Sequence, residues 1–124
     1  MALRITAVLA MVALVLGCGE NGPVAPHEWQ GIGQTSSRTY VVRLVYTRYG
    51  SNVLGSYYLD GRTTPTGKAE GRIDGELIFL DLSPSTTCNY SFAGTITETR
   101  LTGTFVPDPC PAGIPGTWDL LRSN

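Results

Sequence analysis

The segment Lys68-Ala69-Glu70-Gly71-Arg72-Ile73-Asp74-Gly75 shows the organisation of the chain most clearly. Its charged residues alternate with alanine, glycine and isoleucine, which is the pattern of a β-strand with one face in water and the other in a core. The Asp-Gly pair that follows is a strong signal for a tight hairpin turn. We therefore predict a strand over residues 68–73, a turn at Asp74-Gly75, and a second strand over residues 76–83.

The facing of this second strand depends on the length of the turn. A two-residue turn directs Ile78, Leu80 and Leu82 inward, whereas a three-residue turn directs Leu77 and Phe79 inward. We favour the two-residue turn. Because the strand is apolar on both faces, its outer face is also a candidate contact surface.

Residues 38–46 and 53–60 form another predicted hairpin, joined by the turn Tyr49-Gly50-Ser51-Asn52. If Arg48 pairs with Val53, apolar residues of the two strands lie opposite each other on one face. These pairs are Tyr46 with Gly55, Leu44 with Tyr57, and Val42 with Leu59. Register and hydrophobic pattern therefore agree.

A third hairpin is predicted over residues 89–97 and 100–106, joined at Glu98-Thr99. Pairing Thr97 with Arg100 sets Ile96 against Leu101, Gly94 against Gly103, and Phe92 against Phe105. The first and last strands are predicted over residues 28–34 and 116–122. Turn residues recur every 8 to 12 positions, which is typical of an antiparallel all-β sandwich or barrel.

Five of these strands share the motif glycine, any residue, large apolar residue, with both named positions on the inner face. The five copies are Gly55-Ser56-Tyr57, Gly71-Arg72-Ile73, Gly94-Thr95-Ile96, Gly103-Thr104-Phe105 and Gly116-Thr117-Trp118. Glycine on an inner face permits the bends of a curling sheet and leaves room for facing aromatic rings. The chain is thus expected to form an all-β fold, an antiparallel up-and-down barrel of about eight strands.

Over residues 28–122 the chain resembles the calycin-like barrels, the group of the lipocalins and avidins. The resemblance lies in Trp29, in the Gly55-x-Tyr57 and Gly103-x-Phe105 strands, and in the closing Gly116-Thr117-Trp118-Asp119-Leu120-Leu121. It implies a small barrel that binds a small apolar ligand. The avidin ligand set is not matched, because residues 89–106 contain no tryptophan, so biotin is not the expected ligand. The lipoprotein lysozyme inhibitors are also small disulfide-bearing barrels, but their signature loops are absent here.

The N-terminus has the organisation of an export signal. Arg4 is the only charged residue before Cys18, and the apolar run from Ile5 to Leu16 is too short to span a bilayer. The ending Leu14-Val15-Leu16-Gly17-Cys18 resembles a bacterial lipobox, which implies removal of residues 1–17 and attachment of diacylglycerol and palmitate to Cys18. The alternatives are an ordinary signal peptide cut nearby and an uncleaved membrane anchor.

This resemblance implies a lipid-anchored protein of the bacterial cell envelope. Because Gly19 rather than aspartate follows the cysteine, the resemblance places it on the periplasmic side of the outer membrane if the cell is Gram-negative. Residues 18–27 are rich in glycine and proline and lack a hydrophobic period, so we expect a lipidated N-terminus and tether there. Residues 28–124 then form one barrel domain.

Charge and cysteine content narrow the expected partners. Without residues 1–17 the chain has 107 residues with eight basic and ten acidic side chains, so its net charge is −2. This does not favour nucleic acid as a partner. Once Cys18 carries lipid, Cys88 and Cys110 remain and most simply form one disulfide. The predicted register supports this pairing, since it sets Cys88 opposite Pro109. Two free thiols are the alternative; a metal site would need more ligands.

Catalysis is not expected. The only histidine is His27, in the predicted tether, so a serine or cysteine nucleophile would lack its usual base. The acidic stretch from Glu70 to Asp81 lies mostly on outward positions, and Asp119 is also expected to face outward. No phosphate-binding glycine loop precedes a helix. We predict a non-enzymatic protein without metal or cofactor.

The inner aromatic residues have two interpretations. They form either a filled core, since an eight-stranded barrel is only just wide enough for its side chains, or the wall of a ligand pocket. The set is Trp29, Tyr40, Tyr46, Tyr57, Tyr90, Phe92, Phe105 and Trp118. If there is a pocket, Trp29, Tyr40, Tyr57 and Trp118 are the candidate ligand contacts.

Two functions follow from these interpretations. One is the binding of a small apolar ligand in the barrel. The other is an interaction or inhibitor module that meets an envelope protein through loops, with the segment from Pro107 to Pro115 as the candidate surface.

Overall fold

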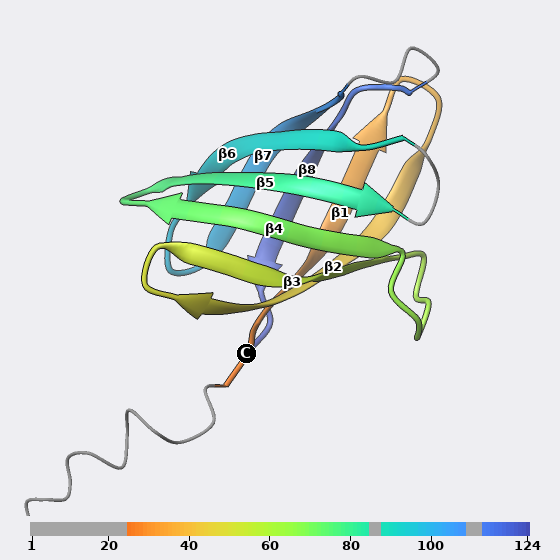
Figure 1. The fold of residues 1–124 in the computed structure, drawn as a ribbon. Helices are drawn as coiled ribbons and strands as arrows, with labels where there is room; N and C mark the ends of the chain where they lie inside the picture. The colour runs from red at the N-terminus through yellow and green to blue at the C-terminus, as the bar shows by residue number, and fades with distance from the viewer. Residues whose placement is uncertain (1–24, 85–87, 109–112) are drawn as a thin grey trace, which may run out of the picture.

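The computed structural model describes residues 25–84, 88–108 and 113–124, and it is an all-β barrel (Figure 1). Eight antiparallel strands follow one another in chain order and close into a barrel. They are β1 (His27–Thr35), β2 (Thr39–Tyr49), β3 (Asn52–Leu59), β4 (Gly67–Asp74), β5 (Leu77–Pro84), β6 (Tyr90–Ile96), β7 (Arg100–Pro107) and β8 (Gly116–Arg122). Within the described ranges there is no helix long and apolar enough to cross a bilayer. The predicted fold class is confirmed.

The barrel closes because β1 pairs with both β2 and β8. Gly33, for example, lies opposite Tyr40 of β2 on one side and opposite Trp118 of β8 on the other. β1 begins at His27, one residue before the predicted start of the domain, because His27 joins the ladder opposite Tyr46.

The predicted registers of the two hairpins are confirmed. β2 and β3 pair with Arg48 opposite Val53 and Leu44 opposite Tyr57. In β6 and β7, Phe92 lies opposite Phe105. The agreement follows from the period of two: any shift by one residue would turn the apolar side chains of a strand into water.

The turn between β4 and β5 has two residues, but they are Gly75 and Glu76 rather than Asp74 and Gly75. Gly75 has a φ of 64°, a left-handed conformation that glycine adopts without strain and that type II′ hairpins require at the first central position. The predicted inward facing is correct, since Ile78, Leu80 and Leu82 are buried. On the outer face, the Arg72 guanidinium lies 4.7 Å from the centre of the Phe79 ring and partly covers it.

The glycines of the repeated motif lie where neighbouring strands approach each other closely. A Cβ atom at Gly71 would overlap the carbonyl oxygen of Phe79, and one at Gly94 would overlap that of Thr102. Four of the five large residues of the motif belong to a core of sixteen buried apolar side chains among the described residues, and the fifth, Ile96, is partly buried and packs against it. Leu44, Leu101 and Leu120 are fully buried near its middle.

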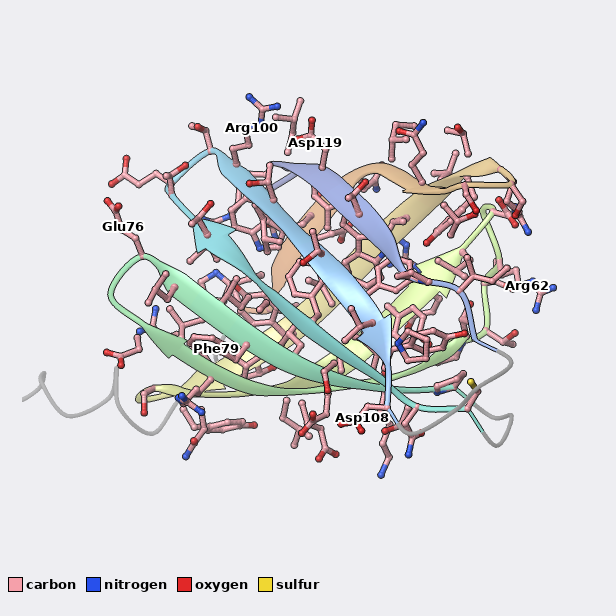
Figure 2. The ribbon with its side chains drawn as sticks, turned by 90° about the horizontal axis from the view of Figure 1, so that it is seen from above. Arg62, Glu76, Phe79, Arg100, Asp108 and Asp119 are labelled. Atoms are coloured by element: carbon pink, nitrogen blue, oxygen red, sulfur yellow. The ribbon has the colours of Figure 1, made fainter. Side chains whose placement is uncertain are left out.

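The strand connections define two ends of the barrel. We call the end that carries the β1–β2, β3–β4, β5–β6 and β7–β8 connections the mouth end, and the opposite end the terminal end. Figure 2 shows Arg62 at the mouth end and Glu76 and Arg100 at the terminal end. β1 starts and β8 finishes at the terminal end (Figure 1). There the Asn124 side-chain amide donates a hydrogen bond of 2.9 Å to the Pro26 carbonyl.

Candidate functional site

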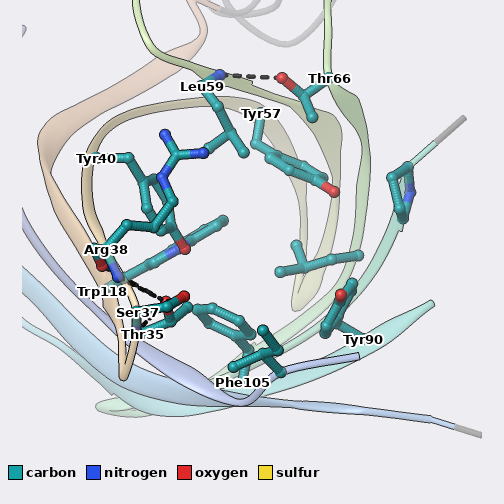
Figure 3. A pocket seen from close by; sticks show the side chains of 13 residues that line it. Thr35, Ser37, Arg38, Tyr40, Tyr57, Leu59, Thr66, Tyr90, Phe105 and Trp118 are labelled. Carbon is teal, nitrogen blue, oxygen red and sulfur yellow. Dashed lines mark hydrogen bonds between the residues drawn. The ribbon is translucent and has the colours of Figure 1, made fainter. Parts of the chain in front are cut away.

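The mouth end contains a cavity of about 360 Å³ that opens between the strand connections (Figure 3). Its walls come from every strand except β4 and from connections at the mouth end, which explains why no single sequence motif encodes it. The described residues that line it are Thr35, Ser37, Arg38, Tyr40, Tyr57, Leu59, Thr66, Leu82, Pro84, Tyr90, Phe105, Ile114 and Trp118.

Trp118 is the centre of the aromatic wall. Its ring centre lies 5.1 Å from that of Phe92, 5.7 Å from that of Tyr57 and 6.2 Å from that of Phe105. Tyr90 continues the wall, with its ring nearly perpendicular to Phe105 at 5.6 Å. Tilted and edge-to-face contacts at these distances stabilise aromatic clusters, so the wall holds its shape without a ligand.

Three tyrosines bring hydroxyl groups to this apolar cavity. Burial is the main cause that raises the pKa of Tyr57 to about 12, and the nearby Tyr90 and Tyr40 act in the same direction. Burial also raises the pKa of Tyr40. The Tyr57 and Tyr40 hydroxyls are therefore uncharged at neutral pH, and each can donate and accept a hydrogen bond.

Gly33 makes room for the Tyr40 ring. A Cβ atom at position 33 would overlap ring atoms of Tyr40 and come within 2.9 Å of its hydroxyl oxygen. Because Gly33 lies between Tyr40 and Trp118 in the ladder, its missing side chain lets Tyr40 lie across the inner surface toward Trp118. This glycine therefore shapes the cavity.

The two tryptophans of the barrel differ in their hydrogen bonding. The Trp29 indole N–H donates to the Tyr46 hydroxyl at 3.3 Å. The Trp118 indole N–H is buried and meets no acceptor at hydrogen-bond distance and angle among the described residues. The Tyr40 hydroxyl is the nearby polar group: hydrogen bonding toward Trp118 lowers the pKa of Tyr40, against the larger effect of burial, although the geometry between the two groups falls outside that of a well-formed hydrogen bond.

One charged side chain, Arg38, belongs to the described lining of the cavity. Its guanidinium forms an ion pair of 2.7 Å with Asp60 and lies 5.2 Å from the centre of the Tyr40 ring. The hydrogen bond from Arg38 holds the pKa of Asp60 below its ordinary value. The rim also carries the Thr66 hydroxyl, which accepts a hydrogen bond from the Leu59 amide at 3.0 Å. The charged group of the described lining is thus paired with a carboxylate of opposite charge.

The terminal end holds a separate hollow of about 580 Å³ that shares no lining residue with the cavity. Trp29 and Tyr46 lie there, together with His27, whose ring stacks on Tyr46 at 5.2 Å between ring centres. The Arg122 guanidinium donates a hydrogen bond of 3.1 Å to Nδ1 of His27. The lining of this hollow contains four charged side chains, namely Arg48, Glu76, Glu98 and Arg122. The hollow is wide but lacks an aromatic wall comparable to that of the cavity.

Three of the four predicted ligand contacts come together. Tyr40, Tyr57 and Trp118 line the cavity, whereas Trp29 lies at the terminal end. Both interpretations of the inner aromatics hold in part, since the middle of the barrel is filled and the mouth end is hollow. Sequence reasoning placed Tyr90 and Phe105 on the inner face but did not name them as contacts.

Other lining residues carried no signal in the sequence. Arg38 and Thr66 belong to connections between strands, and their position over the mouth depends on how those connections fold. The alternation of apolar and polar residues with a period of two predicts which face of a strand a residue occupies, but it does not predict where loop residues lie.

The predicted lipid and disulfide residues lie partly outside the described ranges. Cys18 and Cys110 both do, so lipidation and pairing stay predictions. Cys88 is described, at the mouth end. A Cβ atom on Gly113 would lie 3.0 Å from the Cys88 sulfur, so this sulfur lies beside the chain that follows Cys110.

The described residues contain no group of three or more histidine, cysteine, aspartate or glutamate side chains that could hold a metal ion. No protein-family model matches the chain, and a search of curated proteins finds no similar sequence. The functional argument therefore depends on the geometry of the cavity.

Proposed function

We propose that this protein binds a small, mainly apolar molecule in the cavity at the mouth end of its barrel. The observation that carries the proposal is the composition of the wall, in which a preformed aromatic cluster surrounds a few hydroxyl groups. Ligand sites are typically concave, largely apolar, and equipped with a small number of polar groups that orient the ligand. The volume of about 360 Å³ is at the lower end of the range for such sites, so the ligand is small.

The proposed activity is binding without catalysis. The histidine that could serve as a general base, His27, lies at the terminal end with Tyr46 and Arg122 and not at the cavity. Tyr40 and Tyr57 have raised pKa values, so their hydroxyls stay protonated at neutral pH and are poor bases there. These features support a site that holds its ligand unchanged.

We further propose that the barrel is anchored in the bacterial cell envelope through lipid on Cys18, and that it holds its ligand inside the ring of strands as the calycin-like barrels do. The tether would leave the barrel at the terminal end, where β1 begins. The mouth would then open away from the membrane, toward ligands in the surrounding compartment. Replacing Cys18 with serine should abolish incorporation of radioactive palmitate in bacterial cells, and continued labelling would contradict the anchor.

The ligand proposal can be tested by filling the cavity. Leu59 and Ile96 are both partly buried apolar residues packed against the core, one at the mouth end and one at the terminal end. We expect Leu59→Trp to abolish the fluorescence increase of the neutral probe N-phenyl-1-naphthylamine. Ile96→Trp is the matched control and should leave it unchanged. Equal probe binding by both variants, with unchanged circular dichroism, would refute the assignment of the site.

The alternative function is contact with an envelope protein through the segment from Pro107 to Pro115. This segment joins β7 to β8 at the mouth end, and residues 109–112 lie outside the described ranges. A partner recovered with the purified domain but lost when the segment is shortened would favour this alternative.

A further inference from the structure

We infer that the ligand carries a neutral hydrogen-bond acceptor of the carbonyl type, and that its oxygen is held by the indole N–H of Trp118 together with the hydroxyl of Tyr40. This inference rests on the proposed function and adds the chemical class of the ligand. It starts from a donor that the described fold leaves unused.

The unused donor is the Trp118 indole N–H. The Trp118 side chain is 2% exposed and belongs to the lining of the cavity, yet its Nε1 atom finds no acceptor among the described residues. Buried polar groups are nearly always hydrogen-bonded, and one that is not calls for an explanation. Trp29 differs in this respect, because its indole N–H donates to the Tyr46 hydroxyl.

Tyr40 supplies a second donor next to the first. Gly33 pairs with Tyr40 on one side and Trp118 on the other, and its missing side chain allows the Tyr40 ring to lie across the inner surface beside Trp118. Figure 3 shows both side chains on the same side of the cavity. A carbonyl oxygen has two lone pairs, so it can accept from an indole N–H and a hydroxyl at once.

The charge of the site indicates that this oxygen is neutral. The charged residue of the described lining, Arg38, is paired with Asp60 at 2.7 Å. A carboxylate beside Trp118 would have to leave water without a free cation to compensate it, which is strongly unfavourable in an apolar site. A ketone, aldehyde, ester or quinone oxygen has no such penalty.

The shape of the wall indicates that a ring carries the carbonyl group. Tyr57, Phe105 and Trp118 present tilted aromatic faces and edges, which pack best against a flat apolar body. The chemistry that fits is therefore a small cyclic molecule with one neutral carbonyl oxygen.

The test compares three probes of nearly equal size with the purified domain. These are 2-acetylnaphthalene, which carries a neutral carbonyl group; 2-isopropenylnaphthalene, in which a carbon replaces the oxygen; and 2-naphthoate, which is charged. We expect the ketone to bind roughly tenfold more tightly than the alkene, the effect of about one hydrogen bond, and also more tightly than the carboxylate. Calorimetry or quenching of tryptophan fluorescence measures the affinities.

Nuclear magnetic resonance gives a residue-specific readout. The chain contains two tryptophans, so its spectrum has two indole N–H signals, of which Trp29 serves as an internal control. Binding of 2-acetylnaphthalene should move the Trp118 signal downfield and leave the Trp29 signal nearly unchanged. Trp118→Phe should remove most of the difference in affinity between the ketone and the alkene, because only the Tyr40 hydroxyl then remains as a donor, whereas Trp29→Phe should preserve the difference. Tyr40→Phe should reduce the difference without removing it.

The outcomes separate this inference from the proposed function. If all three probes bind with equal affinity and the Trp118 signal does not move, the cavity is a binding site but the carbonyl inference is wrong. Tighter binding of 2-naphthoate than of the ketone would also overturn it. If no probe binds and Leu59→Trp has no effect on N-phenyl-1-naphthylamine, both the inference and the proposed function fail.

Discussion

Single residues decide which parts of the barrel interior are filled and which are open. Gly33 is one such residue, because its lack of a side chain gives the Tyr40 ring its place beside Trp118. The overlapping atoms belong to the far end of a side chain that can turn, so a larger residue would displace the ring rather than break the strand pairing.

Gly33→Ala should therefore weaken binding more than folding. We expect the affinity for N-phenyl-1-naphthylamine to fall roughly tenfold, equivalent to about 1.4 kcal/mol. The melting temperature should change by only a few degrees, since the strand pairing is kept. Titration of probe fluorescence and circular dichroism measure the two effects. In a Tyr40→Ala background the same substitution should cause no further loss; full additivity would show that the effect does not pass through Tyr40.

His27 links stability to pH at the terminal end. Burial is the main cause that lowers its pKa below the ordinary value of 6.5, and the positive charges of Arg122 and Arg48 add to it. Because the folded state resists protonation more than the unfolded chain, the contribution of neutral His27 is complete above pH 6.5 and is lost as pH falls through the lowered pKa.

We expect the wild-type protein to lose more stability between pH 7.5 and pH 5.0 than His27→Gln, whose side chain does not titrate. Urea unfolding at both pH values measures this difference. An identical change in the two proteins would mean that His27 has the same pKa in the folded and unfolded states.

At the scale of elements, the β1–β2 and β3–β4 connections meet over the mouth through Arg38 and Asp60. Asp60 has a φ of 58°, which non-glycine residues rarely adopt, and its amide donates to the Val41 carbonyl at 2.9 Å. Asparagine tolerates this backbone conformation as well as aspartate does. An Asp60→Asn change therefore removes the negative charge without disturbing the turn.

This change should make the mouth more favourable for anions. We expect the affinity for 2-naphthoate to rise about threefold, because an exposed guanidinium without its carboxylate attracts an anion only modestly. Asp119→Asn is the matched control: it releases Arg100, which lies on the outer surface at the terminal end, and should have no effect. Equal gains in both variants would indicate a general effect of net charge.

At the scale of the whole molecule, the two ends of the barrel differ in the features that they contain. The terminal end brings residues 26–28 and 123–124 together, while the mouth end carries the cavity and Cys88. The Asp108 amide donates to the Asn89 carbonyl at 2.8 Å, so the predicted β6–β7 register continues to the residues next to the cysteines. The pairing of Cys88 with Cys110 stays a prediction, because Cys110 lies outside the described ranges.

Removal of the predicted bridge should cost about 2–5 kcal/mol of unfolding free energy, as is usual for a small exported domain. Chemical unfolding of the wild-type protein with and without reductant measures this loss. The double variant with alanine at positions 88 and 110 should match the reduced protein and should not respond to reductant. Equal stability of the oxidised and reduced wild type would exclude a structural disulfide.

The sequence by itself determined the number of strands, their order and most of their registers. These features depend on alternation along a strand and on turn residues such as Gly75, which act over a few positions. It also determined which aromatic rings face inward. The turn lies at Gly75-Glu76, one residue after the predicted Asp74-Gly75, because the glycine and not the aspartate adopts the left-handed conformation at its first central position.

Only the tertiary structure decided which inward residues share a site. Trp29 and Trp118 both face the interior, yet Trp29 lies near the start of β1, at the terminal end, and Trp118 near the start of β8, at the mouth end. Closure between β1 and β8 joins residues about ninety positions apart, as in the pair Gly33 and Trp118, and no local pattern encodes it. Closure also decides that the Trp118 indole N–H has no acceptor, because it fixes which groups surround this side chain.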